Sequence, residues 1–201
     1  MTNSSSSFSP PDDRKYADDE AYLFGEVAPR FAAQGWLAAY DVLSIARWKA
    51  NRARTHVARR LVSKGAPSVE EGARALTRTL SAAPSDEARF LSALSDWGFL
   101  LPMGSAILTV CYPTTFTVYD VRVCSELGRF SELGNMSPRP KLWARYCEFM
   151  LAVRDAAPTG LSLRDCDRFL WGRSRRDDLE AWLASPALTP ASLLRAGAEA
   201  S

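Results

Sequence analysis

The sequence lacks any long apolar run. No stretch approaches the roughly 20 consecutive apolar residues that a membrane-spanning helix needs. The first residues, M-T-N-S-S-S-S-F-S-P-P-D-D, also lack the basic and apolar regions of a secretory signal peptide. We therefore expect no membrane association, a cytoplasmic location, and a disordered polar leader over residues 1–18.

Residues that could hold a metal or a cofactor are scarce. His56 is the only histidine, and no cysteine or carboxylate stands near it at metal-ligand spacing. The four cysteines form no C-x-x-C pair, and we expect them to be reduced, small core residues. They are Cys111, Cys124, Cys147 and Cys166. The sequence also has no G-x-x-x-x-G-K, G-x-G-x-x-G or G-x-S-x-G motif, so neither a metal nor any other cofactor is expected.

Acidic residues are absent between Val42 and Ser68, although the whole chain has a formal net charge of only +2. The same stretch carries Arg47, Lys49, Arg52, Arg54, Arg59, Arg60 and Lys64. Such a segment suits binding to nucleic-acid phosphates, with an affinity that falls steeply with salt. A solvated surface is the alternative interpretation.

Apolar residues recur at helical spacing along most of the chain, and no strand pattern persists. The sequence predicts an all-α, monomeric protein with one domain over residues 19–185 and a C-terminal helix or tail over 186–201. The expected helices cover residues 19–33 with a kink or break at Pro29, 36–50, 51–64 with a weaker signal, 68–82, 85–97, 103–112, 120–127, 141–156, 162–171, 175–184 and 190–198. Ser68, Ser85 and Thr189 are the expected N-caps.

Asp120 stands inside the apolar run T-F-T-V-Y-D-V-R-V at residues 115–123. An ionised carboxylate among apolar side chains is costly unless it is paired or hydrogen-bonded. Asp120 could cap the helix predicted over 121–127, form half of a salt bridge, or act as a catalytic carboxylate. Capping does not exclude catalysis, because a helix N-terminus favours the ionised form.

The residues on both sides of Asp120 form a longer motif. They read W-G-F-L-L-P-M-G-S-A-I-L-T-V-C-Y-P-T-T-F-T-V-Y-D, with V-R-V-C-S-E-L after the Asp. This order resembles the helix-hairpin-helix DNA glycosylases of the endonuclease III-like superfamily. In that family L-P-G-V-G-x-x-T-A precedes an apolar stretch, and V-D-x-H-V-x-R follows. The resemblance implies a multi-helix bundle with a helix-hairpin-helix element, and it places Asp120 at the catalytic position.

The same resemblance implies a DNA interface. In the family, hairpin glycines let the backbone approach a phosphate, and helix N-terminal amides donate to its oxygens. In this chain the resemblance places the hairpin phosphate site at Gly98, Pro102, Gly104 and Ser105. We expect Arg47, Lys49 and Arg52 to contact the DNA backbone as well.

Two further segments resemble a set of uncharacterised bacterial proteins that share this scaffold and have a degenerate hairpin. They are L-S-I-A-R-W-K-A-N-R at 43–52 and L-R-D-C-D-R-F-L-W at 163–171. Together the two resemblances cover roughly residues 20–175. The second resemblance implies a shared fold and no established activity.

The hairpin departs from the family pattern. Aligning the family's T-A pair with Ser105-Ala106 places its two glycines on Leu100 and Pro102, where bulk and the missing N–H oppose phosphate binding. Arg122 replaces the family's His, and Gly104 replaces the Lys of bifunctional members. Schiff-base chemistry through a hairpin lysine is therefore not expected, and the four-Cys cluster of endonuclease III-like members is absent.

The sequence thus leaves two functions open. The first is a DNA-binding protein that acts on double-stranded DNA as a monofunctional base-excision repair glycosylase, with Asp120 acting on water or on the sugar cation. The alternative is a catalytically inactive helical scaffold that binds a protein partner. Asp120 and the acid-free segment favour the first, while Leu100, Pro102 and the missing hairpin Lys favour the second.

Overall fold

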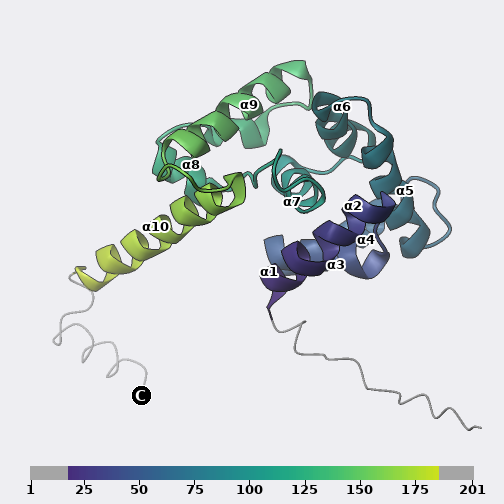
Figure 1. The fold of residues 1–201 in the computed structure, drawn as a ribbon, viewed down its shortest axis with the longest axis horizontal. Coiled ribbons are helices and arrows are strands. Elements are labelled where there is room, and N and C mark those ends of the chain that lie inside the picture. Colours follow the sequence, from purple (N-terminus) through teal and green to yellow (C-terminus); the bar gives the residue numbers. More distant parts are fainter. Residues whose placement is uncertain (1–17, 186–201) are drawn as a thin grey trace, which may run out of the picture.

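The computed structural model describes residues 18–185, and every regular element in this range is helical. The all-α prediction is therefore confirmed (Figure 1). The elements are α1 (Asp19–Tyr22), η2 (Leu23–Val27), α2 (Ala28–Gln34), α3 (Ala39–Lys49), η3 (Asn51–Ala53), α4 (Arg54–Val62), α5 (Val69–Ala82), α6 (Asp86–Leu91), η4 (Ser92–Asp96), α7 (Leu101–Cys111), α8 (Val121–Leu127), η5 (Ser131–Asn135), α9 (Pro140–Asp155) and α10 (Leu163–Leu183). The helix expected at 190–198 and the leader before Asp18 lie outside the described residues.

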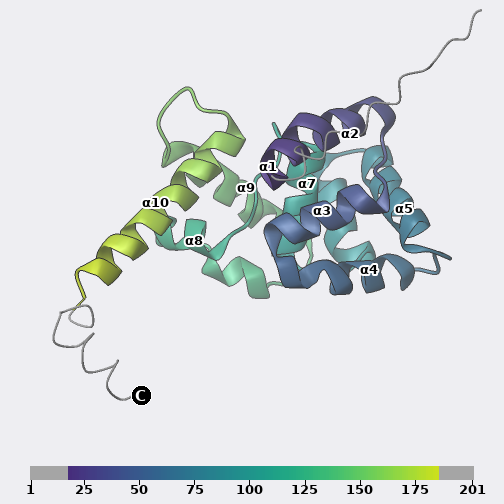
Figure 2. The same cartoon turned by 90° about the horizontal axis from the view of Figure 1, so that it is seen from below.

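Helix α7 forms the centre of the molecule. Nearly all its side chains are buried, as expected for a helix that is apolar on every side. Helices α1 to α6 lie on one side of α7 and α8 to α10 on the other (Figures 1 and 2). No helix in the described part of the chain is long and apolar enough to cross a membrane.

Several helix starts follow the predicted caps, because capping depends on nearby residues. The side chains of Ser68 and Ser85 accept backbone N–H bonds at the starts of α5 and α6, both at 3.1 Å. Pro29 lies in the first turn of α2, directly after the π-helical turn η2, and it does not end the helix.

Helix α3 begins at Ala39, so the predicted start at Trp36 is wrong. Two side chains of α5 accept hydrogen bonds from backbone N–H groups just before α3 and at its first residue. The Leu37 N–H donates to Thr77 Oγ1 at 2.9 Å, and the Ala39 N–H donates to Glu70 Oε2 at 2.8 Å. These long-range bonds satisfy N–H groups that would otherwise need a local cap.

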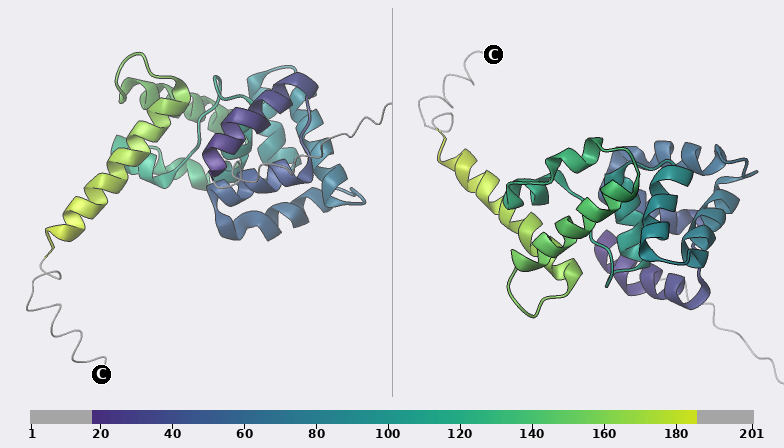
Figure 3. Two further views of the ribbon diagram at one scale, coloured as in Figure 1. Left: turned by 60° about the horizontal axis from the view of Figure 1, so that its bottom comes forward. Right: turned by 90° about the horizontal axis from the view of Figure 1, so that it is seen from above.

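Helix α10 is a single helix of 21 residues, and the prediction of two helices at 162–171 and 175–184 is wrong. Gly172 lowers helix propensity, but it retains its backbone N–H and does not interrupt the hydrogen-bond ladder. The C-terminal half of α10 extends beyond the other helices (Figure 3). It exposes Leu179, Trp182 and Leu183.

An extended segment at 116–119 crosses the core between α7 and α8. Phe116, Val118 and Tyr119 are buried, and so is Thr117. The Tyr119 N–H donates to Ser105 Oγ at 2.9 Å. The Tyr146 hydroxyl donates to the carbonyl of Thr117 and accepts from its N–H. The segment thus has internal partners for backbone groups that are removed from water, and it delivers Asp120 to a fixed place.

Gly72 marks the closest approach of two helices. A Cβ placed on Gly72 of α5 would lie 2.6 Å from the carbonyl oxygen of Leu61 in α4, which is backbone and cannot turn away. A Cβ on Gly172 of α10 would have nothing within 4 Å. Gly172 can therefore serve as the control for Gly72, because both glycines lie in helices and only Gly72 lies against a neighbouring backbone.

We expect Gly72→Ala to lower the free energy of unfolding by about 1–3 kcal/mol, because α4 and α5 must separate. Gly172→Ala should raise it by up to ~1 kcal/mol, through helix propensity alone. Urea unfolding followed by circular dichroism measures both. A Gly72→Ala protein as stable as the wild type would show that α4 and α5 do not pack this closely.

Candidate functional site

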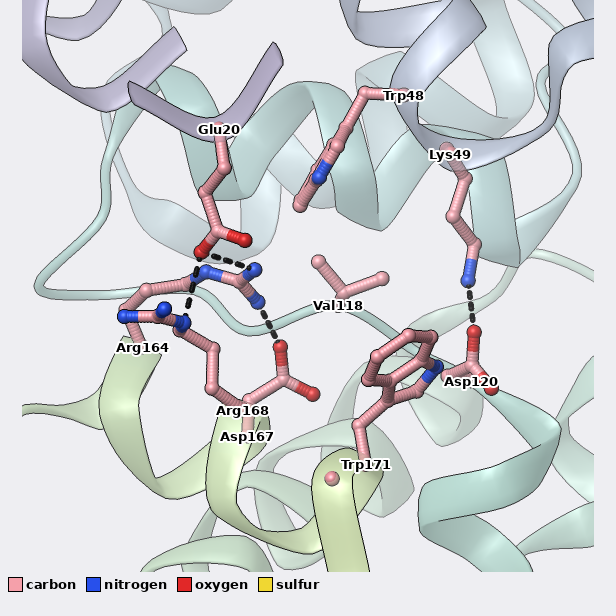
Figure 4. A pocket seen from close by; sticks show the side chains of 10 residues that line it. Glu20, Trp48, Lys49, Val118, Asp120, Arg164, Asp167, Arg168 and Trp171 are labelled. Carbon is pink, nitrogen blue, oxygen red and sulfur yellow. Dashed lines mark hydrogen bonds and ion pairs between the residues drawn. The ribbon is translucent and has the colours of Figure 1, made fainter. Parts of the chain in front are cut away.

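A cavity of about 400 Å³ lies beside Asp120, between the two groups of helices (Figure 4). We call it the Asp120 cavity. Residues from α1 and α3, from the segment before α8, and from α10 form its walls. They are Glu20, Trp48, Lys49, Val118, Asp120, Arg164, Asp167, Arg168, Trp171 and Gly172.

Asp120 is both a helix cap and half of an ion pair. Its Oδ1 accepts the Arg122 N–H at 2.9 Å, which confirms the predicted cap of α8. Its Oδ2 lies 2.5 Å from the Nζ of Lys49. The Asp120 side chain is 22% exposed and faces the cavity, so capping and pairing leave it accessible.

Lys49 ends α3 and points toward the interior of the site. Its side chain is only 12% exposed, because it reaches across to Asp120. The contact of Lys49 with a DNA backbone stays a prediction, and in the structure its Nζ lies against the Asp120 carboxylate. The ion pair fixes the orientation of Asp120 and joins α3 to the start of α8.

A network of ion pairs forms the opposite wall of the cavity. Arg164 pairs with Asp167 on its own helix and with Glu20 of α1 at 2.8 Å, and Arg168 Nε lies 3.0 Å from the same Glu20 carboxylate. The Arg164 guanidinium also lies about 5 Å from the ring centres of Phe24 and Trp48. These contacts join α1 and α3 to α10 and hold the cavity walls together.

Asp167 is the most buried carboxylate of the cavity, with a side chain only 5% exposed. Burial raises the pKa of Asp167 to about 6. The positive charges of Arg164 and Lys49 act in the opposite direction, and the negative charges of Asp120 and Glu20 reinforce the rise.

Two tryptophans supply flat apolar surfaces. Trp48 and Trp171 enter the cavity from α3 and α10, and Val118 lies between them in Figure 4. Trp48 is partly buried at the edge of the core and packs edge-on against Phe24. Aromatic faces of this kind stack readily on the planar rings of nucleobases.

The predicted hairpin residues do not line this cavity. Gly104 and Ser105 are buried in α7, where a Cβ on Gly104 would strike Leu94 and Ser105 holds Tyr119. Both therefore have structural roles here. Pro102 lies in the first turn of α7 and is partly buried. The N-terminal amides of this helix would have to donate to a phosphate, and Pro102 has no N–H to donate.

Gly98 borders a second cavity of about 540 Å³ on the side of α4. The guanidinium of Arg60 lies over Gly98, and Leu100 is 76% exposed beside it. An exposed apolar side chain therefore stands beside the position where the family's hairpin would bind a phosphate.

The basic segment divides into paired and unpaired cations. Arg47 pairs with Asp19, and Lys49 pairs with Asp120. The five cations between residues 52 and 64 form no ion pair with a described carboxylate, and we call them the unpaired basic segment. It consists of Arg52, Arg54, Arg59, Arg60 and Lys64. Arg52 lies in the short turn η3 between α3 and α4 and is exposed, as expected for a residue that contacts an external anion.

Sequence reasoning missed Glu20 and the α10 wall as site residues. A signal was present in L-R-D-C-D-R-F-L-W, because Arg164, Asp167, Arg168 and Trp171 fall three, four and seven positions apart on one helical face. Charged residues at this spacing usually form a solvated face. Only the neighbouring α1 and α3 show that this face lines a cavity.

Comparison of the chain with models of known families, with curated proteins and with solved structures gives no match. No group of three or more His, Cys, Asp or Glu residues in the described range is placed to hold a metal ion. The candidate site therefore depends on its own geometry, which combines a paired carboxylate, a buried carboxylate and two indole rings.

Asp167 makes a pH-dependent contribution to stability. The ordinary pKa of an Asp side chain is 3.8, so above this pH Asp167 of the unfolded chain loses its proton. In the folded protein the pKa of Asp167 is about 6, so the side chain keeps its proton up to about that pH. Stability should therefore fall as pH rises through this window. We expect the wild type to lose about 3 kcal/mol relative to Asp167→Asn, since each pKa unit corresponds to ~1.4 kcal/mol. Urea unfolding of both proteins from pH 4 to 7 tests this, and parallel curves would contradict it.

Proposed function

We propose that this protein binds double-stranded DNA and hydrolyses the N-glycosidic bond of an extrahelical base, as a monofunctional base-excision glycosylase. The observation that carries the proposal is the position of Asp120, which opens into a cavity bordered by two tryptophans. The proposal includes a helix-hairpin-helix glycosylase-like scaffold, with Trp97–Leu100 as the connector to α7. It also includes a monomer in the reducing cytoplasm, which suits four free cysteines.

The cavity residues have separate roles in this proposal. Trp48 and Trp171 stack on a base that has left the duplex. Asp120 then faces the sugar, where its negative charge stabilises the oxocarbenium-like transition state as the glycosidic bond breaks. Lys49 keeps the carboxylate in one orientation, since the ion pair leaves little rotational freedom.

The unpaired basic segment supplies the DNA-binding surface. Its cations come after Lys49 in the chain, from Arg52 in η3 through α4 to Lys64 just beyond that helix, so they lead away from the cavity wall. Cations without a described carboxylate partner can neutralise phosphates without first breaking an ion pair. In the proposed complex, the DNA backbone lies along η3 and α4, and the displaced base enters the cavity beside α3.

Charge reversal tests this surface. We expect the double variant Arg52→Glu, Arg54→Glu to bind a duplex oligonucleotide at least ~10-fold more weakly at about 50 mM salt. The slope of log affinity against log salt should become less steep by about 2, one for each lost phosphate contact. Fluorescence anisotropy across a salt series measures both quantities.

Lys141→Glu is the matched control for this surface, because Lys141 is an exposed cation in the first turn of α9 and lies outside the basic segment. Its affinity should match that of the wild type. Wild-type protein that fails to bind DNA at low salt would rule out the proposal.

The role of Asp120 is tested with a variant that keeps the cap. Asn caps helices as well as Asp does, so Asp120→Asn should preserve the start of α8 while removing the negative charge. We expect abasic-site formation in duplexes carrying damaged bases to slow by about 100-fold or more. Asp178→Asn is the control, since it breaks the neighbouring Arg122–Asp178 pair outside the cavity. Equal rates for wild type and Asp120→Asn would remove Asp120 from the reaction.

A catalytically inactive scaffold that binds a protein partner is the second candidate. Two observations favour it: both Asp120 oxygens already have partners, and the free end of α10 exposes Leu179, Trp182 and Leu183. This candidate predicts that wild type and Asp120→Asn release no base from any duplex. The excision assay therefore separates the two functions.

A further inference from the structure

Asp167 gives the Asp120 cavity a second carboxylate. One of its oxygens pairs with Arg164, and the other points into the cavity toward Trp171 (Figure 4). The proposed function assigns Asp167 no role, and its burial is costly for a group that only anchors an arginine. Arg164 already has Glu20 as a second partner.

The charged and titratable groups around Asp167 come from every element packed against it. They are Arg164 and Arg168 on its own helix, Glu20 of α1, Lys49 of α3, Asp120 before α8 and the hydroxyl of Tyr146 on α9. Burial outweighs the two nearest cations, so the pKa of Asp167 rises to about 6. A fraction of Asp167 therefore holds a proton near neutral pH, which an exposed Asp does not.

The two carboxylates thus stand in different environments within one cavity. Asp120 is fixed by Lys49 and by the N–H of Arg122, both of which stabilise its negative charge. Asp167 is nearly removed from water, and Arg164, with which it forms an ion pair, is shared with Glu20. Paired carboxylates that differ in this way typically divide the roles of acid and base.

We propose that Asp167 is the proton donor to the leaving base, and that the substrate is consequently a neutral purine. This inference rests on the proposed function. The C1′–N9 bond breaks with its electron pair moving to the base, while the Asp167 proton passes to a ring nitrogen such as N7 or N3. Water then adds to C1′ and gives a proton to Asp120. Solvent returns a proton to Asp167 and takes one from Asp120, so the net reaction is hydrolysis.

The substrate class follows from the chemistry of the leaving group. Neutral purines carry ring nitrogens outside the glycosidic bond that can accept a proton, and protonation makes them better leaving groups. A 7-methylguanine already carries a positive charge, so it leaves without an acid. The comparison of these two leaving groups isolates the proton that Asp167 supplies.

The test measures single-turnover excision from duplexes containing 7-methylguanine, uracil or one of three neutral purines (adenine, hypoxanthine and 8-oxoguanine). We expect Asp167→Asn to lose about 100-fold on the neutral purine that the wild type excises, a typical effect for a general acid. The same variant should keep the wild-type rate on 7-methylguanine. Asp177→Asn, the same change at an exposed site on α10, should alter neither rate.

The wild type alone provides a second readout. Its rate on the neutral purine should fall as pH rises above about 6, when Asp167 loses its proton. The rate on 7-methylguanine should not show this fall. This measurement remains valid even if Asp167→Asn does not fold.

Each other outcome has a defined meaning. Equal losses on both leaving groups, or a wild type that excises only uracil or only 7-methylguanine, would overturn the inference and leave the proposed function intact. A neutral-purine rate that does not fall above pH 6 would do the same. A wild type that excises nothing would overturn the proposed function, and the inference with it.

Discussion

The site depends on one constraint, which is that an extended chain segment crosses the core of a helical protein. Residues 116–119 are removed from water but have no helix to satisfy their backbone groups. Ser105 and Tyr146 supply hydrogen bonds to Tyr119 and Thr117, and these bonds set where the segment leaves the core. Asp120 follows immediately, so its position is a consequence of how the buried backbone is paired.

Electrostatics then join the two groups of helices around the cavity. Lys49 of α3 reaches Asp120, and Glu20 of α1 reaches Arg164 and Arg168 of α10. Partly buried pairs of this kind are costly to break on one side, because the remaining charge stays away from water. The same burial that holds the walls together gives Asp120 and Asp167 different environments within one small volume.

The local features could be predicted from the sequence, while the long-range contacts could not. Caps at Ser68, Ser85 and Asp120 depend on residues within one helical turn, and these were correct. The start of α3 depends on Glu70, and the ion pair of Asp120 joins residues 71 positions apart. Nothing in the basic stretch distinguishes Lys49, which turns inward, from Arg52, which is exposed. The sequence places the charged cavity residues of α10 on one helical face, but it does not show that α1 and α3 lie opposite that face.

If Asp120 stabilises the oxocarbenium-like transition state, it should recognise positive charge at the sugar position. A duplex with a cationic pyrrolidine analogue of an abasic site resembles the oxocarbenium transition state, and a tetrahydrofuran analogue has the same shape without the charge. We expect the wild type to bind the pyrrolidine duplex at least about 100-fold more tightly than the tetrahydrofuran duplex, and Asp120→Asn to lose this preference. Equal affinity of the wild type for the two duplexes would contradict this role of Asp120.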